Sequence, residues 1–214
     1  MNITTQAVIF DMDGVISDTQ IVHATVESGL LHEYGIDLTP AEITRRFAGV
    51  QNREMFPQLF TEYDKVLSSL KELVNEKWRR MEKYEGEIAE VPGTRECIES
   101  LKAQGIPLAV ASASKLSYVH MVLNKLGLSE TFNAICSAEE VAKGKPEPDV
   151  FLLAATRLNI TPPDCIVIED GISGMIAAHR GGMRCIGLVR EGNPTDYPAD
   201  IIVKDLRDVI ITKQ

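Results

Sequence analysis

The sequence lacks several features that mark special classes of protein. No apolar run is long enough to cross a membrane, and residues 1–6 lack the basic start and apolar middle of a signal peptide. The four cysteines are scattered without a Cys-x-x-Cys pair, which favours buried free thiols over disulfides or a zinc site. Internal repeats and low-complexity segments are also missing. We therefore expect a cytoplasmic protein that does not associate with membranes.

Positive charge is also in short supply. The chain has 22 lysines and arginines against 31 aspartates and glutamates, which gives a formal net charge of -9. Nucleic-acid binding depends on clustered cations, so this composition argues against a nucleic-acid partner. An anionic substrate would have to be held by local cations, a bound metal ion and backbone amides. The 214 residues, 44% of them hydrophobic, suffice for one large core and a small second module, and we expect a monomer.

The most informative stretch is Ala7-Val-Ile-Phe-Asp-Met-Asp-Gly14, a short apolar strand that ends in two carboxylates and a glycine. Residues two apart in an extended chain share a side, so Asp11 and Asp13 begin on one face, and Gly14 then allows a sharp turn. Two carboxylates this close repel each other, and a cation would compensate them. With no histidine or cysteine in the motif, these hard oxygen ligands favour Mg²⁺ over zinc. Taken alone, an Asp-x-Asp pair can also be a solvated turn.

Two kinds of segment alternate along the chain. Residues 20–90 have helical periodicity without convincing strands, with a capped helix start at Thr39-Pro-Ala-Glu42 and a long helix expected over Tyr63–Tyr84. Beyond this insert, helices alternate with short apolar strands, which indicates a doubly wound parallel sheet. The first strand belongs to the same sheet, so we expect an α/β fold whose Rossmann-like core comprises residues 1–19 and 91–214, interrupted by an all-helical domain. The strands expected after the insert are Ile106–Ala111, Ala134–Cys136, Cys165–Ile168, Cys185–Val189 and Ile201–Val203.

Three later motifs lie at the ends of predicted strands or before a helix. Val110-Ala-Ser-Ala-Ser-Lys115 supplies hydroxyls, Lys143-Gly-Lys-Pro-Glu-Pro-Asp149 supplies a lysine, and Ile166-Val-Ile-Glu-Asp-Gly171 ends an apolar strand in two acids. Together with the first motif, these runs resemble, in order, the four motifs of the haloacid dehalogenase superfamily of phosphatases and phosphomutases. The resemblance extends from Ala7 to about Val203. It implies a phosphoryl-transfer enzyme in which the helical insert is a mobile cap over the active site.

The acids and the lysine of these motifs suit phosphoryl transfer. Asp11 is the expected nucleophile, because a carboxylate can form an aspartyl phosphate and a strand end holds it for in-line attack. Asp13 can donate a proton to the leaving oxygen and later accept one from the attacking hydroxyl. Lys145, constrained between Gly144 and Pro146, can offset the charge of Asp11 and of the phosphoryl group.

The remaining motif residues are expected to bind the phosphoryl group and the metal ion. Ser112 and the amides that follow it, at Ala113 and Ser114, can hold phosphoryl oxygens where a helix begins. The resemblance implies that Asp13 meets the metal through its backbone carbonyl. The expected ligands of the Mg²⁺ cofactor are Asp11, Asp13, Glu169 and Asp170.

Substrate specificity is expected to come from the cap. The chain most resembles the branch of the superfamily that contains β-phosphoglucomutase and related sugar-phosphate phosphatases. By that resemblance, Thr19 and His23 match a threonine and a histidine at the hinge of the mutase, and Lys77 matches its cap lysine. Ser114 and Lys115 match residues that hold the distal phosphate of the substrate.

Two departures weaken the mutase interpretation. Leu116 stands where the mutase has an asparagine, and the run Gly49-Val-Gln-Asn-Arg-Glu54 has one residue more than its counterpart, which would displace Arg53 from its role in substrate binding. His23 and Lys77 also have a simpler interpretation. On a charged helical cap, each could be an ordinary surface residue.

We therefore predict a Mg²⁺-dependent phosphatase that hydrolyses a small phosphorylated metabolite, with a sugar phosphate as the expected substrate. The alternative is a hexose phosphomutase, which uses the same aspartyl phosphate but returns the phosphoryl group to a sugar. A phosphate-binding regulatory module without turnover is a third candidate, against which the complete set of Asp11, Asp13, Lys145 and Asp170 argues. A response-regulator receiver also pairs acids with Mg²⁺ and a later lysine, but it lacks a helical insert after its first strand.

Overall fold

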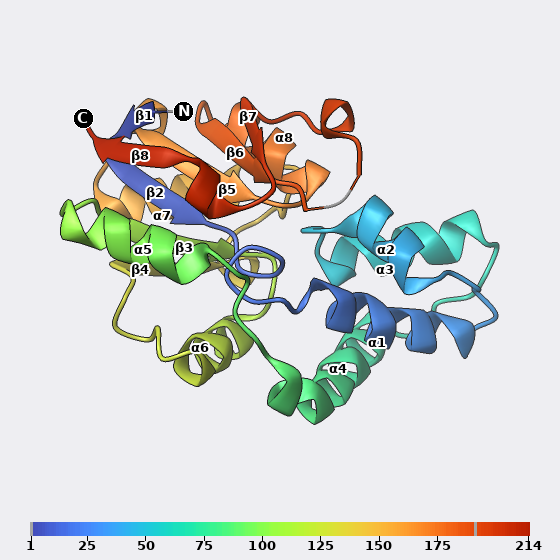
Figure 1. Cartoon of the computed structure of the whole chain (residues 1–214). Helices are drawn as coiled ribbons and strands as arrows, with labels where there is room; N and C mark the ends of the chain where they lie inside the picture. Colours follow the sequence, from blue (N-terminus) through green and yellow to red (C-terminus); the bar gives the residue numbers. More distant parts are fainter. Residues whose placement is uncertain (1, 191) are drawn as a thin grey trace.

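The protein is built around a six-stranded β-sheet flanked by helices (Figure 1). The computed structural model describes residues 2–190 and 192–214. The strands lie in the order β4-β3-β2-β5-β6-β7, and every adjacent pair is parallel. This arrangement confirms the predicted doubly wound α/β fold. The strands are β2 (Ala7–Phe10), β3 (Leu108–Ser112), β4 (Ala134–Ser137), β5 (Cys165–Glu169), β6 (Arg184–Leu188) and β7 (Ile201–Val203).

The strands are buried on both faces of the sheet, which explains why they are nearly continuous apolar runs in the sequence. In β2, Val8 and Phe10 belong to one hydrophobic cluster, whereas Ala7 and Ile9 belong to a second one. The first cluster includes side chains of α5 and α6, and the second includes side chains of α7 and α8. These helices are α5 (Thr94–Ala103), α6 (Leu116–Lys125), α7 (Asp149–Leu158) and α8 (Ile172–Arg180).

Strand β2 lies in the middle of the sheet, between β3 and β5. Val8 is paired with Leu108 of β3, and Phe10 is paired with Ile168 of β5. The strand order reverses at this point, because β3 and β4 lie on one side of β2 and the later strands lie on the other. Open α/β folds bind ligands at such a switch point, beyond the carboxyl ends of the strands. The loops after β2, β3 and β5 are therefore well placed to form a site.

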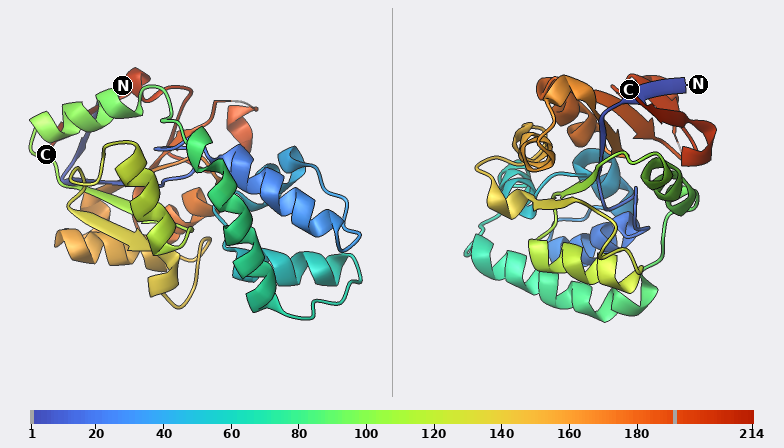
Figure 2. Two further views of the ribbon diagram at one scale, coloured as in Figure 1. Left: turned by 90° about the horizontal axis from the view of Figure 1, so that it is seen from below. Right: turned by 90° about the vertical axis from the view of Figure 1, so that its left-hand side faces the viewer.

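The helices of the insert pack on one another beside the sheet, and the left view of Figure 2 shows them as a separate group. Helix α1 packs against α2 and α4, and α3 packs against α4. The predicted capping box is present at the start of α2, where the Glu42 amide donates to Thr39 Oγ1 and the Thr39 amide donates to the Glu42 carboxylate. The predicted helical insert is thus confirmed. Its elements are α1 (Gln20–His32), α2 (Pro40–Phe47), α3 (Asn52–Glu62), α4 (Leu70–Met81) and the 3₁₀ helix η1 (Glu82–Glu87).

The prediction of one long helix over Tyr63–Tyr84 was wrong. Helix α3 ends at Glu62, and Asp64 adopts a left-handed backbone conformation with φ of 52° that interrupts any helix. Helix α4 begins only at Leu70. Ser69 caps its N-terminus, because the Ser69 hydroxyl accepts a hydrogen bond from the Glu72 amide at 3.3 Å. The charged periodicity of this region therefore belongs to the end of one helix and the start of another.

A second, two-stranded parallel sheet joins the two ends of the chain and was not predicted from the sequence. It pairs β1 (Asn2–Thr5) with β8 (Ile210–Lys213). The hydroxyl of Thr5 donates to the carbonyls of Ala7 and Asp164, which ties β1 to the main sheet. The remaining short elements are the 3₁₀ helices η2 (Ala138–Glu140), η3 (Pro162–Asp164), η4 (Pro194–Asp196) and η5 (Leu206–Asp208).

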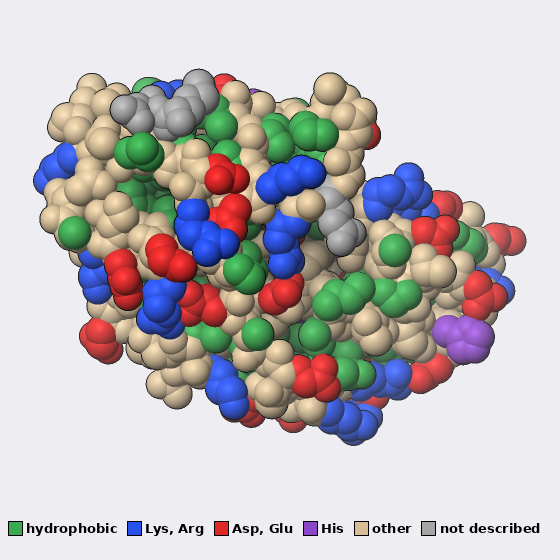
Figure 3. All heavy atoms as spheres, viewed as in Figure 1, with side chains coloured by type: hydrophobic (Ala, Val, Ile, Leu, Met, Phe, Trp, Pro, Cys, Tyr) green, Lys and Arg blue, Asp and Glu red, His purple; other side chains and the backbone are tan. Residues whose placement is uncertain are grey.

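Three further observations concern the helices, the surface and the cysteines of the protein. In the part of the chain that the structure describes, no helix is both long and apolar enough to span a membrane. The space-filling view shows acidic and basic side chains interspersed over the face seen there (Figure 3). The predicted free, buried thiols are confirmed for Cys97, Cys136, Cys165 and Cys185.

Candidate active site

Asp11 lies directly beyond the carboxyl end of β2, where its backbone amide still donates to the carbonyl of Ile168 at 2.9 Å. Lys145, from the loop before α7, reaches Asp11 through the interior of the protein. Its ammonium nitrogen lies 2.5 Å from Asp11 Oδ1 and 2.8 Å from Glu169 Oε1, and all three side chains are buried. A strand end and a buried ion pair thus fix the expected nucleophile in position.

These charges shift the pKa values of Asp11 and Lys145. Burial is the largest effect on Asp11; the negative charges of Glu169 and Asp13 add to it and Lys145 opposes it, so that the pKa of Asp11 rises to about 8. Burial alone would lower the pKa of Lys145, but the carboxylates of Asp11 and Glu169 outweigh it and raise that pKa. Lys145 is therefore a permanent cation beside Asp11.

Asp11, Glu169 and Asp170 form an acidic cluster that suits a metal ion. Each offers one carboxylate oxygen, and these oxygens all lie within 4.8 Å of one another. Burial, followed by repulsion from Glu169 and Asp11, raises the pKa of Asp170 well above its usual value. A divalent cation would relieve this repulsion, and a set of oxygen donors without nitrogen or sulfur is the type that Mg²⁺ prefers.

Two glycines leave room for these carboxylates. A Cβ atom on Gly14 would lie 2.0 Å from Asp170 Oδ2, and φ of +90° at Gly14 is itself unfavourable for other residues. A Cβ atom on Gly174 would lie 1.8 Å from Glu169 Oε1. The amide of Gly171 also donates to Glu169 Oε2 at 2.6 Å. The glycines of the first and last motifs therefore have a steric role in the acidic cluster.

Asp13 has surroundings that differ from those of Asp11. Its carboxylate accepts hydrogen bonds from Thr19 Oγ1 at 2.5 Å and from Ser114 Oγ at 2.8 Å, and His23 Nε2 lies 3.3 Å from it. Burial would raise the pKa of Asp13, but the nearby imidazole of His23 and the hydrogen bonds from Thr19 and Ser114 together hold it far below its usual value. The pKa of Asp13 is thus lowered where that of Asp11 is raised, which is the reverse of what a proton donor and an ionised nucleophile require. A cation bound next to Asp11 and a phosphate bound next to Asp13 would oppose these two shifts.

His23 and Lys77 are buried groups of the closed cap and not surface residues, which excludes the simpler interpretation of both. Lys77 is 1% exposed, and its Nζ lies 2.8 Å from His23 Nδ1 and 3.8 Å from Glu27 Oε1. It also lies 3.7 Å from the centre of the Trp78 ring. Burial lowers the pKa of Lys77 to about 8, although Glu27 and Asp13 oppose the shift.

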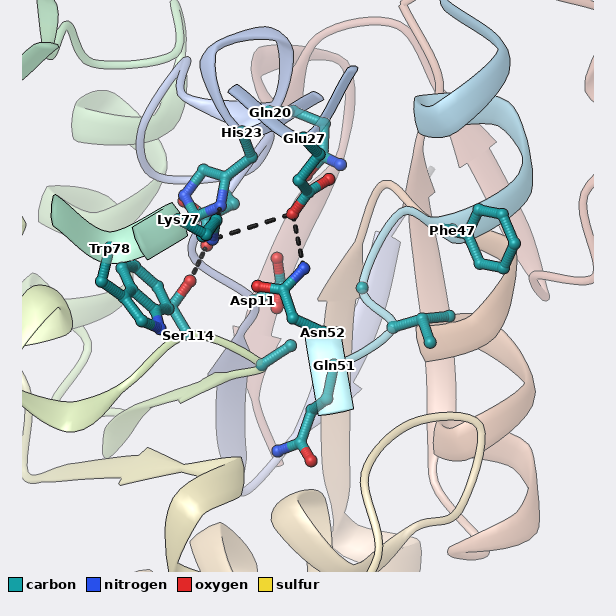
Figure 4. Close-up of a pocket in the computed structure, with 14 residues that line it drawn as sticks. Asp11, Gln20, His23, Glu27, Phe47, Gln51, Asn52, Lys77, Trp78 and Ser114 are labelled. Carbon is teal, nitrogen blue, oxygen red and sulfur yellow. Dashed lines mark hydrogen bonds and ion pairs between the residues drawn. The ribbon is translucent and has the colours of Figure 1, made fainter. Parts of the chain in front are cut away.

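These groups surround one pocket between the cap and the sheet (Figure 4). Asp11 and Ser114 lie on its core side, whereas His23, Glu27 and Lys77 come from cap helices. The pocket is lined by Asp11, Asp13, Gln20, His23, Glu27, Phe47, Gly49, Val50, Gln51, Asn52, Lys77, Trp78, Ala113 and Ser114. A buried nucleophile at the floor of an enclosed polar pocket can attack a phosphorylated ligand held by both domains.

Comparison with known proteins agrees with this geometry. Residues 8–188 match the family model of haloacid dehalogenase-like hydrolases. The chain belongs to that family. It is therefore a hydrolase-type enzyme, and the resemblance inferred from its four motifs is confirmed.

Relatives within the haloacid dehalogenase-like family include both phosphatases and mutases. The chain is 35% identical over 191 residues to phosphorylated carbohydrates phosphatase of Thermotoga maritima, an alignment that covers 88% of this chain and 87% of that protein. It is 30% identical over 213 residues to β-phosphoglucomutase of Bacillus subtilis, covering 96% and 92% of the two chains. The crystal structure of β-phosphoglucomutase from Clostridium difficile has a TM-score of 0.84 at 29% identity and covers 96% of this chain and 93% of its own.

Not every residue that the family resemblance suggested lines the pocket. Arg53 is exposed and donates to the carbonyls of Val141 and Ala142 at 3.4 and 3.2 Å. Lys115 does not line this pocket; it lines a second pocket that also includes Trp78, with its Nζ 5.1 Å from the centre of the Trp78 ring. In this closed arrangement, neither of these two expected substrate-binding cations reaches the site of this hydrolase.

Ser112 supports the phosphate loop indirectly. Its hydroxyl is fully buried and accepts a hydrogen bond from the Ser114 amide at 3.0 Å, while Ala113 and Ser114 themselves line the pocket. Glu169 is likewise buried beneath the pocket against Lys145. Both residues therefore support the site without lining the pocket.

Sequence reasoning missed several residues of the pocket. Glu27 follows His23 by one helical turn and therefore shares its face of α1, a periodicity that could have identified it. Gln51 and Asn52 lie in the run Gly49–Glu54, which has one residue more than its counterpart. In this run only Arg53 was expected to bind the substrate. The side-chain amide oxygen of Gln51, Oε1, is buried and has no hydrogen-bond partner among the described residues. No local signal distinguished these two amides from ordinary loop residues.

Proposed function

We propose that the protein is a Mg²⁺-dependent phosphatase that hydrolyses a small phosphorylated metabolite, in particular a sugar phosphate, through an aspartyl phosphate. One observation carries the proposal. The carboxylate of Asp11 lies at the floor of the closed pocket, bonded to the buried cation of Lys145 and next to the acidic cluster. A nucleophile beside a fixed cation is what transfer of a charged phosphoryl group requires.

The residues of the site have separate roles in this reaction. A carboxylate oxygen of Asp11 attacks phosphorus, and the bond from phosphorus to the ester oxygen breaks as Asp13 gives that oxygen a proton. Water then attacks the aspartyl phosphate, Asp13 takes the proton of that water, and inorganic phosphate leaves. The pKa of Asp13 lies far below its usual value, so the negative charge of a bound phosphate must raise this pKa before Asp13 can donate a proton.

Mg²⁺ would be held by Asp11, Asp170 and Glu169, with the backbone carbonyl of Asp13 as a further proposed ligand. When bound, the ion supplies positive charge that stabilises the phosphoryl oxygens. The ammonium group of Lys145 offsets part of the negative charge of Asp11 and Glu169. We further propose that the protein acts as a monomer.

A hexose phosphomutase is the second candidate, because His23 is buried next to Asp13 and Lys77 is buried against His23, so that neither lies on the surface. Such a closed cap could exclude water and favour transfer to a sugar hydroxyl. A mutase must also hold the second phosphate of a bisphosphate, however, and Arg53 and Lys115 lie outside the pocket. The position of these two cations outside the pocket supports the phosphatase.

One panel of substrates separates the candidates. We expect the purified enzyme with Mg²⁺ to release phosphate from several sugar phosphates, and the Lys77→Ala variant to change KM for some of them with a modest loss of kcat. Rapid interconversion of β-glucose 1-phosphate and glucose 6-phosphate, primed by a sugar bisphosphate and abolished in Lys77→Ala, would establish the mutase instead. Release of nitrophenol from p-nitrophenyl phosphate would exclude a regulatory module without turnover.

A further inference from the structure

We propose that Glu27 and Asn52 form a subsite for the hydroxyl groups of the substrate. This subsite selects phosphate monoesters whose far end is uncharged and rich in hydroxyls over those that carry a second phosphate or a carboxylate. The inference rests on the proposed phosphatase function and specifies the substrate class of the same pocket.

The first argument is the geometry of this pair. Asn52, at the start of α3, donates from Nδ2 to Glu27 Oε1 of α1 at 2.6 Å, and Glu27 is 7% exposed. Figure 4 shows these two side chains meeting at the dashed hydrogen bond, with Glu27 above Asp11 and Asn52 close to Asp11 in this view. The hydrogen bond fixes the orientation of the carboxylate. Glu27 Oε2 and Asn52 Oδ1 make no hydrogen bond to any described residue, so two acceptor oxygens are available to a ligand.

The second argument is the charge of the cap side. Among the residues described as lining the pocket, Lys77 is the only lysine or arginine. Its Nζ is already engaged, at 2.8 Å from His23 Nδ1 and 3.8 Å from Glu27 Oε1. A second anionic group on the substrate would therefore meet the Glu27 carboxylate without a free cation to balance it. Like charges brought together in a buried site repel strongly.

Hydroxyl groups, in contrast to anionic groups, interact favourably with the Glu27 carboxylate. A hydroxyl can donate to an ionised carboxylate, and such charge-assisted hydrogen bonds are stronger than neutral ones. An amide oxygen next to it can accept from a second hydroxyl on the neighbouring carbon. A polar subsite of this kind also rejects substrates that lack the hydroxyls, because its buried acceptors would then remain unpaired.

Two substrates with the same carbon chain test the selection. Glucitol 6-phosphate and 6-phosphogluconate differ only at carbon 1, which carries a hydroxymethyl group in the first and a carboxylate in the second. We expect the wild-type enzyme to have a kcat/KM for glucitol 6-phosphate that is at least about tenfold higher. The Glu27→Gln variant keeps the size of the side chain but loses its charge, so this ratio should fall by about tenfold. The matched control Glu33→Gln, an exposed residue just beyond α1, should leave the ratio unchanged.

A second variant removes the orienting bond and keeps the charge. Asn52→Leu should raise KM for glucitol 6-phosphate by about tenfold and still discriminate against 6-phosphogluconate. Equal kcat/KM values for the two substrates in the wild type, or a ratio that Glu27→Gln does not change, would overturn the subsite. If the wild type also hydrolyses no p-nitrophenyl phosphate, the proposed phosphatase function itself is wrong. Hydrolysis of p-nitrophenyl phosphate with an unresponsive ratio overturns the subsite alone.

Discussion

The Nζ of Lys77 lies 2.8 Å from Nδ1 of His23, and the other ring nitrogen of His23 lies 3.3 Å from the carboxylate of Asp13. An ammonium group can only donate, so His23 accepts at Nδ1 and presents Nε2–H toward Asp13. The cap lysine therefore selects the tautomer of a histidine that stabilises the ionised acid–base residue of the core. Closure of the cap and the protonation state of Asp13 are coupled through this contact.

The buried charge of Lys77 predicts an unusual pH dependence of stability. Burial lowers the pKa of Lys77 from its ordinary 10.5 to about 8, so the unfolded chain binds more protons between those two pH values. Stability rises with pH wherever the unfolded state binds more protons. Compared with Lys77→Met, the wild type should therefore gain up to about 3 kcal/mol of unfolding free energy between pH 8 and 10.5. Urea unfolding of both proteins across this range measures the difference, and parallel curves would contradict the prediction.

Replacement of the nucleophile should abolish turnover and spare the fold. Asp11→Asn should lower kcat for p-nitrophenyl phosphate by at least about a thousandfold, because an amide cannot attack phosphorus. The raised pKa of Asp11 means that its site disfavours a negative charge, so a neutral amide should not reduce the melting temperature. Asp37→Asn, on an exposed carboxylate of the cap, is the matched control. A folded Asp11→Asn enzyme with a tenth of the wild-type rate would rule out this nucleophile.

The acidic cluster predicts dependence on a divalent cation. Activity should disappear in excess chelator and return when Mg²⁺ is added in excess of it. Asp170→Ala removes one carboxylate of the cluster and should require at least about tenfold more Mg²⁺ for half-maximal activity. A Mg²⁺ titration of both proteins makes the comparison. Full activity in chelator would contradict the prediction.

The site also requires a residue without a side chain at position 174, next to Glu169. A Cβ atom at residue 174 would lie 1.8 Å from Glu169 Oε1, so Gly174→Ala should displace this carboxylate and weaken both the ion pair with Lys145 and the activity. We expect a loss of at least about tenfold in kcat/KM. Gly29→Ala is the matched control, because a Cβ atom there meets nothing within 4 Å and alanine favours the helix by roughly 0.5–1 kcal/mol. Equal activities of the two variants would contradict the steric argument.

The position of Arg53 outside the pocket predicts that this residue contributes little to the hydrolysis of sugar monophosphates. Because its guanidinium bonds only weakly to two exposed-loop carbonyls outside the pocket, Arg53→Ala should change kcat/KM for sugar monophosphates by less than about threefold. Steady-state phosphate release from glucose 6-phosphate measures this effect. A loss of a hundredfold would show that Arg53 enters the pocket during turnover.

Much of the fold could be predicted because its signals are local. The strands that form the sheet are short apolar runs, and each was located to within two residues of its observed ends. The capping box of α2 spans four residues and could be recognised directly. By contrast, the break between α3 and α4 depends on the left-handed backbone conformation of Asp64. The residue type alone does not predict that conformation. The pairing of β1 with β8 joins the two ends of the chain, and no local pattern announces it.

The sequence by itself determined the family and indicated the proposed catalytic groups, because Asp11, Asp13, Lys145 and Asp170 stand in short motifs whose order specifies that family. Only the tertiary structure decided which cap residues join them. Asn52 meets Glu27 across 25 positions of sequence, and Lys77 meets His23 across 54. Whether such a polar side chain is buried in the pocket or exposed to water depends on how the helices of the cap pack against the sheet. That packing is a sum of many long-range contacts, so the periodicity of one helix cannot reveal it.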